Sequence, residues 1–176
     1  PVGLGLTMTN LAKIQLFQQQ VDQAEPLVQE SLAIYQELGD ERGIGWSVSA
    51  LGNIACARGD YAQAAALYQE AKRLFEKLAA QVDLLWLDFD LGELARAQGN
   101  GGQAEVHYQA GLMLAQRLGN KRATALLLDR LSMVAGQAGH YGQAITWSEQ
   151  SIGLQRELGN LLGLREALQH RGDLAQ

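Results

Sequence analysis

The chain has 176 residues, and its 14 basic and 19 acidic side chains give a formal net charge of −5. This charge argues against a nucleic-acid-binding surface, which needs clustered Lys and Arg, and no apolar run reaches the ~18 residues that span a membrane. Glycine is unusually frequent, with 20 residues against 2 prolines, so the positions of the glycines need an explanation.

The cysteine content and the start of the chain bear on its compartment. A single cysteine, Cys56, excludes an internal disulfide framework and a multi-cysteine zinc site. The first residues lack the basic region and the long apolar core of a signal peptide. We therefore expect a cytoplasmic protein, and because the chain begins at Pro1 without Met, we expect a fragment of a longer one.

Glycine recurs about every 20 residues, and in most cases Asp, Asn or His follows it. Glycine after the last helical turn adopts the left-handed conformation that ends a helix, and a following Asp or Asn accepts hydrogen bonds from the first amides of the next helix. Residues 19–20 and 79–80 depart from this rule. The pairs that follow it are Gly39-Asp40, Gly59-Asp60, Gly99-Asn100, Gly119-Asn120, Gly139-His140 and Gly159-Asn160.

The segments between these pairs are about 18 residues long, and their apolar residues recur at spacings of three and four, as in amphipathic helices. Connections of two residues make successive helices antiparallel, and no segment shows the alternation of a strand. The sequence therefore predicts an all-α fold. The nine expected helices cover residues 3–18, 21–38, 41–58, 61–78, 81–98, 101–118, 121–138, 141–158 and 161–175.

The sequence also repeats with a period of 40 residues, so that each repeat holds two helices. Small residues recur at two places in the frame, where they let helices approach closely, and larger residues fill the neighbouring volume. On the first helix of each repeat the small residues are Ala12, Gly52, Gly92 and Ser132, and on the second they are Ala24, Ala64, Ala104 and Ala144. Each helical pair must stack on its neighbours to bury its apolar faces.

This pattern resembles the tetratricopeptide repeat (TPR). In the second frame the resemblance rests on Leu51-Gly52, Gly59-Asp60-Tyr61, Ala64, Tyr68 and Ala71, and the later frames keep part of this set. It implies a right-handed α-solenoid, or superhelix, of about four and a half helix-turn-helix units in a single domain over 1–176. The units are about 1–40, 41–80, 81–120, 121–160 and a partial one over 161–176. The 40-residue period resembles the C-terminal TPR sensors of bacterial MalT-like and AfsR-like STAND regulators.

In the TPR family, one face of each first helix lines the concave side and contacts the ligand. Carried over to this chain, the resemblance implies a binding face of Lys13, Phe17, Trp46, Ser49, Asn53, Trp86, Phe89, Glu93, Arg96, Asp129 and Met133. The two tryptophans would supply apolar contact area, and the polar residues would orient a peptide or a small effector. Alternatively, both tryptophans pack between adjacent first helices, and the charged side chains are solvated.

The sequence shows no catalytic constellation. Neither a Gly-x-Ser-x-Gly elbow nor a His-Glu-x-x-His pair occurs, and the three histidines lie in unrelated contexts. The run Gly99-Asn100-Gly101-Gly102 resembles a phosphate loop, but it lacks the following Lys and Ser or Thr and joins two helices. We therefore expect no enzyme, no cofactor and no metal.

Two functions remain open. The first is a TPR module that binds a protein segment or a small effector on its concave face, as the sensor or interaction part of a bacterial signalling or transcriptional regulator. The second is a structural scaffold or a self-association module, because the last segment exposes apolar residues, namely Leu161, Leu162, Leu164 and Leu168. Neither function requires contact with nucleic acid or a membrane.

Overall fold

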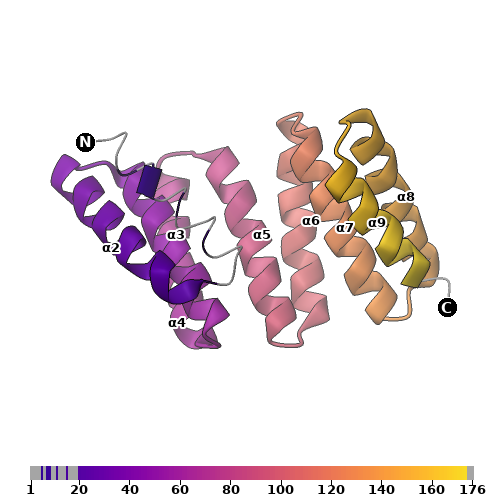
Figure 1. The fold of residues 1–176 in the computed structure, drawn as a ribbon, viewed down its shortest axis with the longest axis horizontal. Helices are drawn as coiled ribbons and strands as arrows, with labels where there is room; N and C mark the ends of the chain where they lie inside the picture. Colours follow the sequence, from indigo (N-terminus) through magenta and orange to yellow (C-terminus); the bar gives the residue numbers. More distant parts are fainter. Residues whose placement is uncertain (1–4, 6, 9–10, 12–14, 16–19, 174–176) are drawn as a thin grey trace. The chain divides into compact units, whose positions relative to one another are not determined.

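The computed structural model describes residues 20–173, together with 5, 7, 8, 11 and 15. Over residues 20–173 every regular element is a helix (Figure 1). These helices are α2 (Val21–Leu38), α3 (Glu41–Ala57), α4 (Tyr61–Lys77), α5 (Gln81–Ala97), α6 (Gly101–Arg117), α7 (Lys121–Gln137), α8 (Tyr141–Glu157) and α9 (Leu161–Asp173). Helices α3 to α8 each begin at the residue that the sequence predicts and end one residue earlier than expected.

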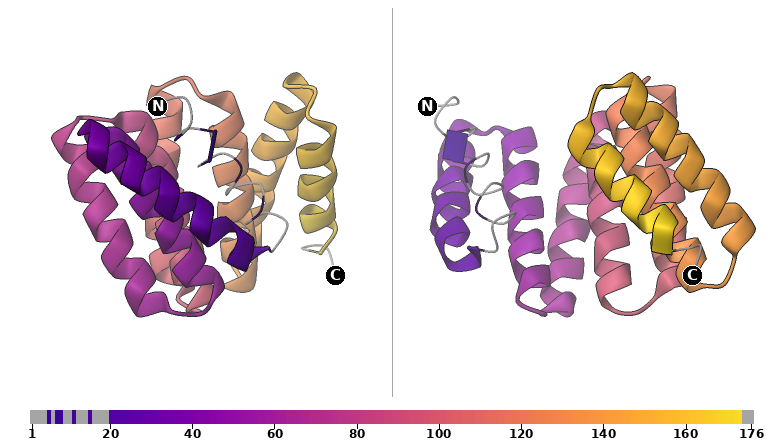
Figure 2. Two further views of the ribbon diagram at one scale, coloured as in Figure 1. Left: turned by 60° about the vertical axis from the view of Figure 1, so that its left-hand side comes forward. Right: turned by 45° about the vertical axis from the view of Figure 1, so that its right-hand side comes forward.

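The chain divides into two compact units, residues 1–90 and 91–176, and the boundary falls within α5. In the first unit, α2 packs against α3 and α3 against α4. In the second unit, α6 packs against α7, α7 against α8 and α8 against α9, and α9 also touches α7 (Figure 2). None of the helices among the described residues is long and apolar enough to cross a membrane.

The connections between the helices follow the predicted rule. The six glycines before the caps all have positive φ, between 62° and 80°. Asp40, Asp60, Asn100 and Asn120 each accept a hydrogen bond from the amide three residues later. His140 occupies the same position, but its side chain accepts no such bond. At the exceptional turn, Ala79 takes the place of glycine with φ 49°.

Aromatic rings in the first unit lie directly against glycines of α3. A Cβ atom added to Gly52 would lie 2.5 Å from the ring of Tyr68, so the predicted close approach at this position is confirmed. Gly43 and Gly45, to which the sequence pattern assigns no role, make the same kind of contact. Their added Cβ atoms would lie 2.2 Å from Tyr35 and 2.5 Å from a ring carbon of Phe75.

In the second unit, the close contact between the two helices of a repeat is made in two different ways. The ring of Tyr108 lies over Gly92, where an added Cβ would be 2.3 Å away. One repeat later, Ser132 and Ser148 stand at the positions of the glycine and the tyrosine, and both are buried. Ser132 Oγ donates a hydrogen bond to the carbonyl oxygen of Ala144 at 2.8 Å, which ties α7 to α8.

Candidate functional site

The predicted binding face falls into separate parts of the described structure. Lys13 and Phe17 lie outside the described residues. In the first unit, the structure brings together Trp46, Ser49, Asn53 and Trp86. Phe89 is not part of that group, but its ring meets the ring of Trp86 edge to face at 6.2 Å. The remaining predicted residues, Glu93, Arg96, Asp129 and Met133, lie in the second unit.

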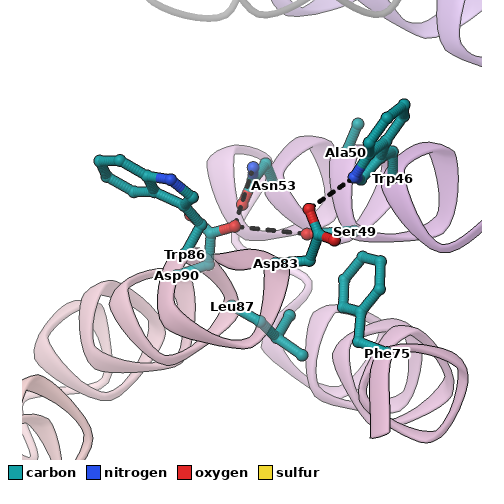
Figure 3. A pocket seen from close by; sticks show the side chains of 9 residues that line it. All are labelled: Trp46, Ser49, Ala50, Asn53, Phe75, Asp83, Trp86, Leu87 and Asp90. Carbon is teal, nitrogen blue, oxygen red and sulfur yellow. Dashed lines mark hydrogen bonds between the residues drawn. The ribbon is translucent and has the colours of Figure 1, made fainter. Parts of the chain in front are cut away.

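The four residues of the first unit surround a hollow of about 80 Å³, which we call the tryptophan hollow (Figure 3). Helices α3 and α5 supply most of its lining, and the buried Phe75 of α4 gives it an apolar part. Two carboxylates of α5 that the sequence pattern did not single out also line it. The lining residues are Trp46, Ser49, Ala50, Asn53, Phe75, Asp83, Trp86, Leu87 and Asp90.

The carboxylate of Asp83 accepts two hydrogen bonds from α3. Arg42 Nε donates to Oδ2 at 2.7 Å, and the indole Nε1 of Trp46 donates to Oδ1 at 2.8 Å. Arg42 and Trp46 are four residues apart, so they lie on one face of the helix, one turn from each other. The Asp83 side chain is 9 % exposed, so these bonds compensate a carboxylate that has lost most of its contact with water.

The carboxylate of Asp90 makes a similar pair of contacts two turns further along α5. Ser49 Oγ donates to Asp90 Oδ2 at 3.3 Å, and Asn53 Nδ2 lies 3.5 Å from the same oxygen. The Asn53 amide is held from the other side as well, because the hydroxyl of Tyr68 donates to its Oδ1 at 2.5 Å. The hydroxyl of a core tyrosine therefore orients a polar group of the tryptophan hollow.

The two tryptophans have different surroundings. Trp46 is half-buried, its ring meets that of Tyr35 edge to face at 6.3 Å, and the Arg42 guanidinium lies 5.1 Å from its ring centre. Trp86 is 38 % exposed. Contacts within the chain therefore hold Trp46 in place, while Trp86 presents a large aromatic surface to solvent.

In the second unit, the carboxylate of Glu93 accepts three hydrogen bonds. The donors are Tyr108 at 2.6 Å, Arg96 at 2.7 Å and Arg130 at 3.0 Å. Burial by itself raises the pKa of Glu93, but the bonds from Arg96 and Tyr108 and the charge of Arg130 outweigh it and hold the pKa below its ordinary value. Burial and the neighbouring Glu93 carboxylate raise the pKa of Tyr108.

Arg130 connects three of the predicted residues of the second unit, although the sequence pattern did not single it out. It donates to Glu93 and, at 3.2 Å, to Asp129, and its Nη1 lies 3.8 Å from the sulfur of Met133. Asp129 is 5 % exposed and also lies 3.0 Å from Nδ1 of His170 on α9. Over the described residues, no three side chains of the metal-ligating types converge on one point.

These contacts share a spacing that the repeat period explains. The pairs that link one first helix to the next are 37 or 41 residues apart, which is the 40-residue period minus three or plus one. Once the structure has given these two separations, a search of the sequence for donors and acceptors finds Asp83, Asp90 and Arg130. The apolar pattern within a single helix cannot identify these residues, because it does not say which turn of one helix faces which turn of the next.

Comparisons with known proteins agree with this architecture. The family model of the tetratricopeptide repeat matches residues 4–77 and 83–157. No curated protein matches the chain. Among solved structures, BtubC (BKLC) from P. vanneervenii is 18 % identical and superposes with a TM-score of 0.82 over 98 % of this chain and 72 % of its own.

Two further solved structures superpose on almost the whole chain. A signal transduction ATPase with numerous domains (STAND) with a tetratricopeptide repeat sensor, from Pyrococcus horikoshii, has 15 % identity and a TM-score of 0.77 over 97 % of this chain. A Rap protein, solved in complex with Competence and Sporulation Factor, has 12 % identity and a TM-score of 0.83 over 99 % of this chain. This chain spans 26 % of the length of the STAND protein and 54 % of the length of the Rap protein. At 12–18 % identity, these structural similarities show only that the fold is shared. The family model, in contrast, covers most of the sequence, and the chain therefore belongs to the tetratricopeptide repeat family.

Proposed function

We propose that this chain is a non-enzymatic interaction module that binds a protein or peptide segment along its first helices, on the concave face of a right-handed superhelix. The observation that carries the proposal is the tryptophan hollow, where an exposed aromatic ring lies beside hydrogen-bonding groups from two successive repeats. Binding sites combine apolar surface with a few placed polar groups in this way. The fold of the family is itself typical of protein-interaction modules.

Trp86 is the residue from which we expect the largest share of the binding energy. Tryptophan is enriched among the residues that dominate protein interfaces, because it buries a large rigid area at a small cost in conformational entropy. Around it, the carboxylates of Asp83 and Asp90 can accept hydrogen bonds from a bound chain. A small effector that presents the same groups is the alternative occupant of the hollow.

The narrower role that we propose is the sensor or interaction part of a bacterial signalling or transcriptional regulator that acts in the cytoplasm. The resemblance of the fold to the STAND protein with its tetratricopeptide repeat sensor and to the Rap protein supports this role. In this view residues 1–176 form one continuous solenoid domain of about four and a half repeats, which a longer protein uses as its recognition part.

The test is binding to an array of synthetic peptides of varied sequence. Replacing Trp86 by Ala should weaken the binding of the captured peptides by roughly thirtyfold, the effect of losing about 2 kcal/mol at an interface hot spot. The matched control is Met113→Ala, because Met113 on α6 is also an exposed apolar residue but does not line the hollow. If both variants bind like the wild type, the hollow is not the binding site.

Self-association is the second candidate, and the exposed leucines of α9 favour it. Leu161 is 79 % exposed, and Leu162 and Leu168 are exposed beside it. An apolar face of this kind is stabilised when a second copy covers it. Light scattering should then show a mass that rises with concentration and that falls to the monomer in the variant Leu161→Gln/Leu162→Gln. A constant monomer mass in the wild type would exclude this role.

A further inference from the structure

Arg42, Trp46 and Asp83 form a compact arrangement at one side of the tryptophan hollow. The guanidinium of Arg42 donates to the Asp83 carboxylate at 2.7 Å and lies 5.1 Å from the centre of the Trp46 ring. The Trp46 indole donates to the other carboxylate oxygen at 2.8 Å. A planar cation therefore meets a carboxylate and an aromatic ring at the same time, which is the combination that proteins use to recognise arginine.

The repeat scaffold does not require this arrangement. The residues one period further along the sequence are Val82, Trp86 and Ala123, and those two periods along are Arg122, Leu126 and Gly163. Neither set holds the cation and the carboxylate together. Ion pairs that are shielded from water add little net stability compared with apolar residues of similar size. This pair is therefore a feature of one frame and not a general requirement of the repeat scaffold.

The two charged partners differ in their access to solvent. The Arg42 side chain is 50 % exposed, whereas that of Asp83 is 9 % exposed. Asp83 and Trp46 line the tryptophan hollow, and Arg42 lines a second, more open hollow of about 520 Å³ beside the α4–α5 turn. The carboxylate is thus a fixed, inner group, and the guanidinium reaches it from outside on a flexible side chain, so one guanidinium can leave and another can enter.

We propose that Trp46 and Asp83 form a guanidinium-binding subsite that Arg42 fills from within the chain, and that an arginine side chain of the bound segment replaces Arg42 there. The second half of this statement rests on the proposed function, whereas the first half does not. The subsite selects arginine over lysine, because only a planar guanidinium can stack on the indole while it donates from Nε or Nη to the carboxylate.

The subsite is tested by chemical rescue. Replacing Arg42 by Ala leaves the buried Asp83 carboxylate with the Trp46 indole N–H, so this variant should melt at a lower temperature than the wild type. Millimolar N-ethylguanidinium should restore part of the lost melting temperature, because it binds the folded state only. Equal concentrations of N-ethylammonium should not do so.

The double variant Arg42→Ala/Asp83→Asn is the control, since it has the same opening without the carboxylate, and N-ethylguanidinium should leave its melting temperature unchanged. Rescue that is equal for both cations, absent in R42A, or equal in the double variant overturns the subsite. If R42A is unfolded without the additive, circular dichroism measures how much protein refolds with each cation. Refolding with N-ethylguanidinium but not with N-ethylammonium then supports the subsite, and equal or absent refolding overturns it.

The replacement of Arg42 by a peptide arginine, which we call the exchange, is tested with the peptides that the array captures. Each peptide is synthesised with arginine, with lysine and with citrulline at its basic position, and the dissociation constants are measured for the wild type and R42A. We expect the arginine peptide to bind at least about tenfold better than its citrulline form, the range of one charge-assisted hydrogen bond. We also expect it to bind R42A more tightly than the wild type.

The outcomes separate the two proposals. If peptides bind through Trp86 without a preference for arginine, the exchange is wrong and the proposed function stands. If no peptide binds either protein, the proposed function and the exchange both fail, and the rescue experiment alone still decides the subsite. Rescue of R42A together with arginine-selective binding supports both.

Discussion

A glycine inside a helix has opposite effects on stability according to what lies beside it. Where the helix surface is open, glycine weakens the helix by about 0.5–1 kcal/mol relative to Ala. Where a ring lies against the backbone, no other residue fits without a shift. The chain contains both cases, at Gly52 beneath Tyr68 and at Gly153 on an exposed part of α8, with no atom within 4 Å of an added Cβ.

Substituting these two glycines by Ala should therefore have opposite effects. We expect Gly52→Ala to lower the free energy of unfolding by about 1–3 kcal/mol, because the new methyl group displaces the Tyr68 ring. Gly153→Ala should raise it by about 0.5–1 kcal/mol. Urea denaturation of both variants measures the two changes, and a loss of stability in G153A similar to that in G52A would contradict this account of the packing.

Glu93 should make stability depend on pH. Its pKa in the folded protein lies below the ordinary value of 4.5, so its charged form stabilises the fold above that pH. The contribution is lost as the pH falls through the lowered pKa, when the carboxylate takes up a proton in the folded state too. The free energy of unfolding of the wild type should thus exceed that of Glu93→Gln near pH 7, and the difference should shrink steadily at acidic pH.

Denaturation of both proteins between pH 7 and pH 3 measures this difference. The control is Glu70→Gln, which removes one carboxylate from the exposed side of α4. A difference for E93Q that stays constant over the whole range, or that grows toward low pH, would show that the three hydrogen bonds to Glu93 do not stabilise its charged form.

At the scale of the helices, the turns are the part that the sequence specifies best. Glycine with positive φ and a capping Asp or Asn follow directly from local chemistry, and the structure confirms them at Gly39-Asp40 and Gly59-Asp60. The helix contacts of Gly43 and Gly45 were not predictable in the same way. They depend on which aromatic ring of the neighbouring helix reaches them, which is a matter of tertiary packing.

The α4–α5 turn tests the role of the left-handed residue. Ala79 holds φ 49° where the other turns between α2 and α9 have glycine, and this conformation costs a residue with a Cβ atom about 1 kcal/mol. We expect Ala79→Gly to raise the free energy of unfolding by about that amount and Gly139→Ala, at the equivalent position before α8, to lower it by a similar amount. Denaturation midpoints report both changes, and a lower stability of A79G would contradict the expectation.

At the scale of the whole molecule, a repeat protein is stabilised mainly by contacts between neighbouring repeats. The effect of a core substitution should therefore stay local. In G52A, we expect hydrogen exchange to speed up in α3 and α4, which form the contact, and to stay unchanged in α7 and α8 of the second unit. Mass spectrometry of peptic fragments measures this, and an equal increase throughout would show that the chain unfolds as one cooperative block.

The sequence predicted the helices over residues 20–173, but it did not predict how the candidate binding residues on them are connected. Trp46 was expected either to face a ligand or to pack between first helices, and in the structure it donates to a buried carboxylate of the next first helix. That partner, Asp83, depends on the offset between neighbouring repeats. Periodicity along one helix carries no information about this offset, so only the three-dimensional arrangement reveals it.

The spacing of 37 and 41 residues between hydrogen-bonded partners has a consequence for the order of the repeats. A duplication or loss of exactly 40 residues would keep every core position in register, but it would change which polar residues meet. If residues 81–120 were lost, for example, Ser49 and Asn53 would face Arg130 in place of Asp90 and would lose the carboxylate to which they donate. The apolar scaffold permits the repeats to be shuffled, and the polar residues on the first helices specify one sequence of neighbours.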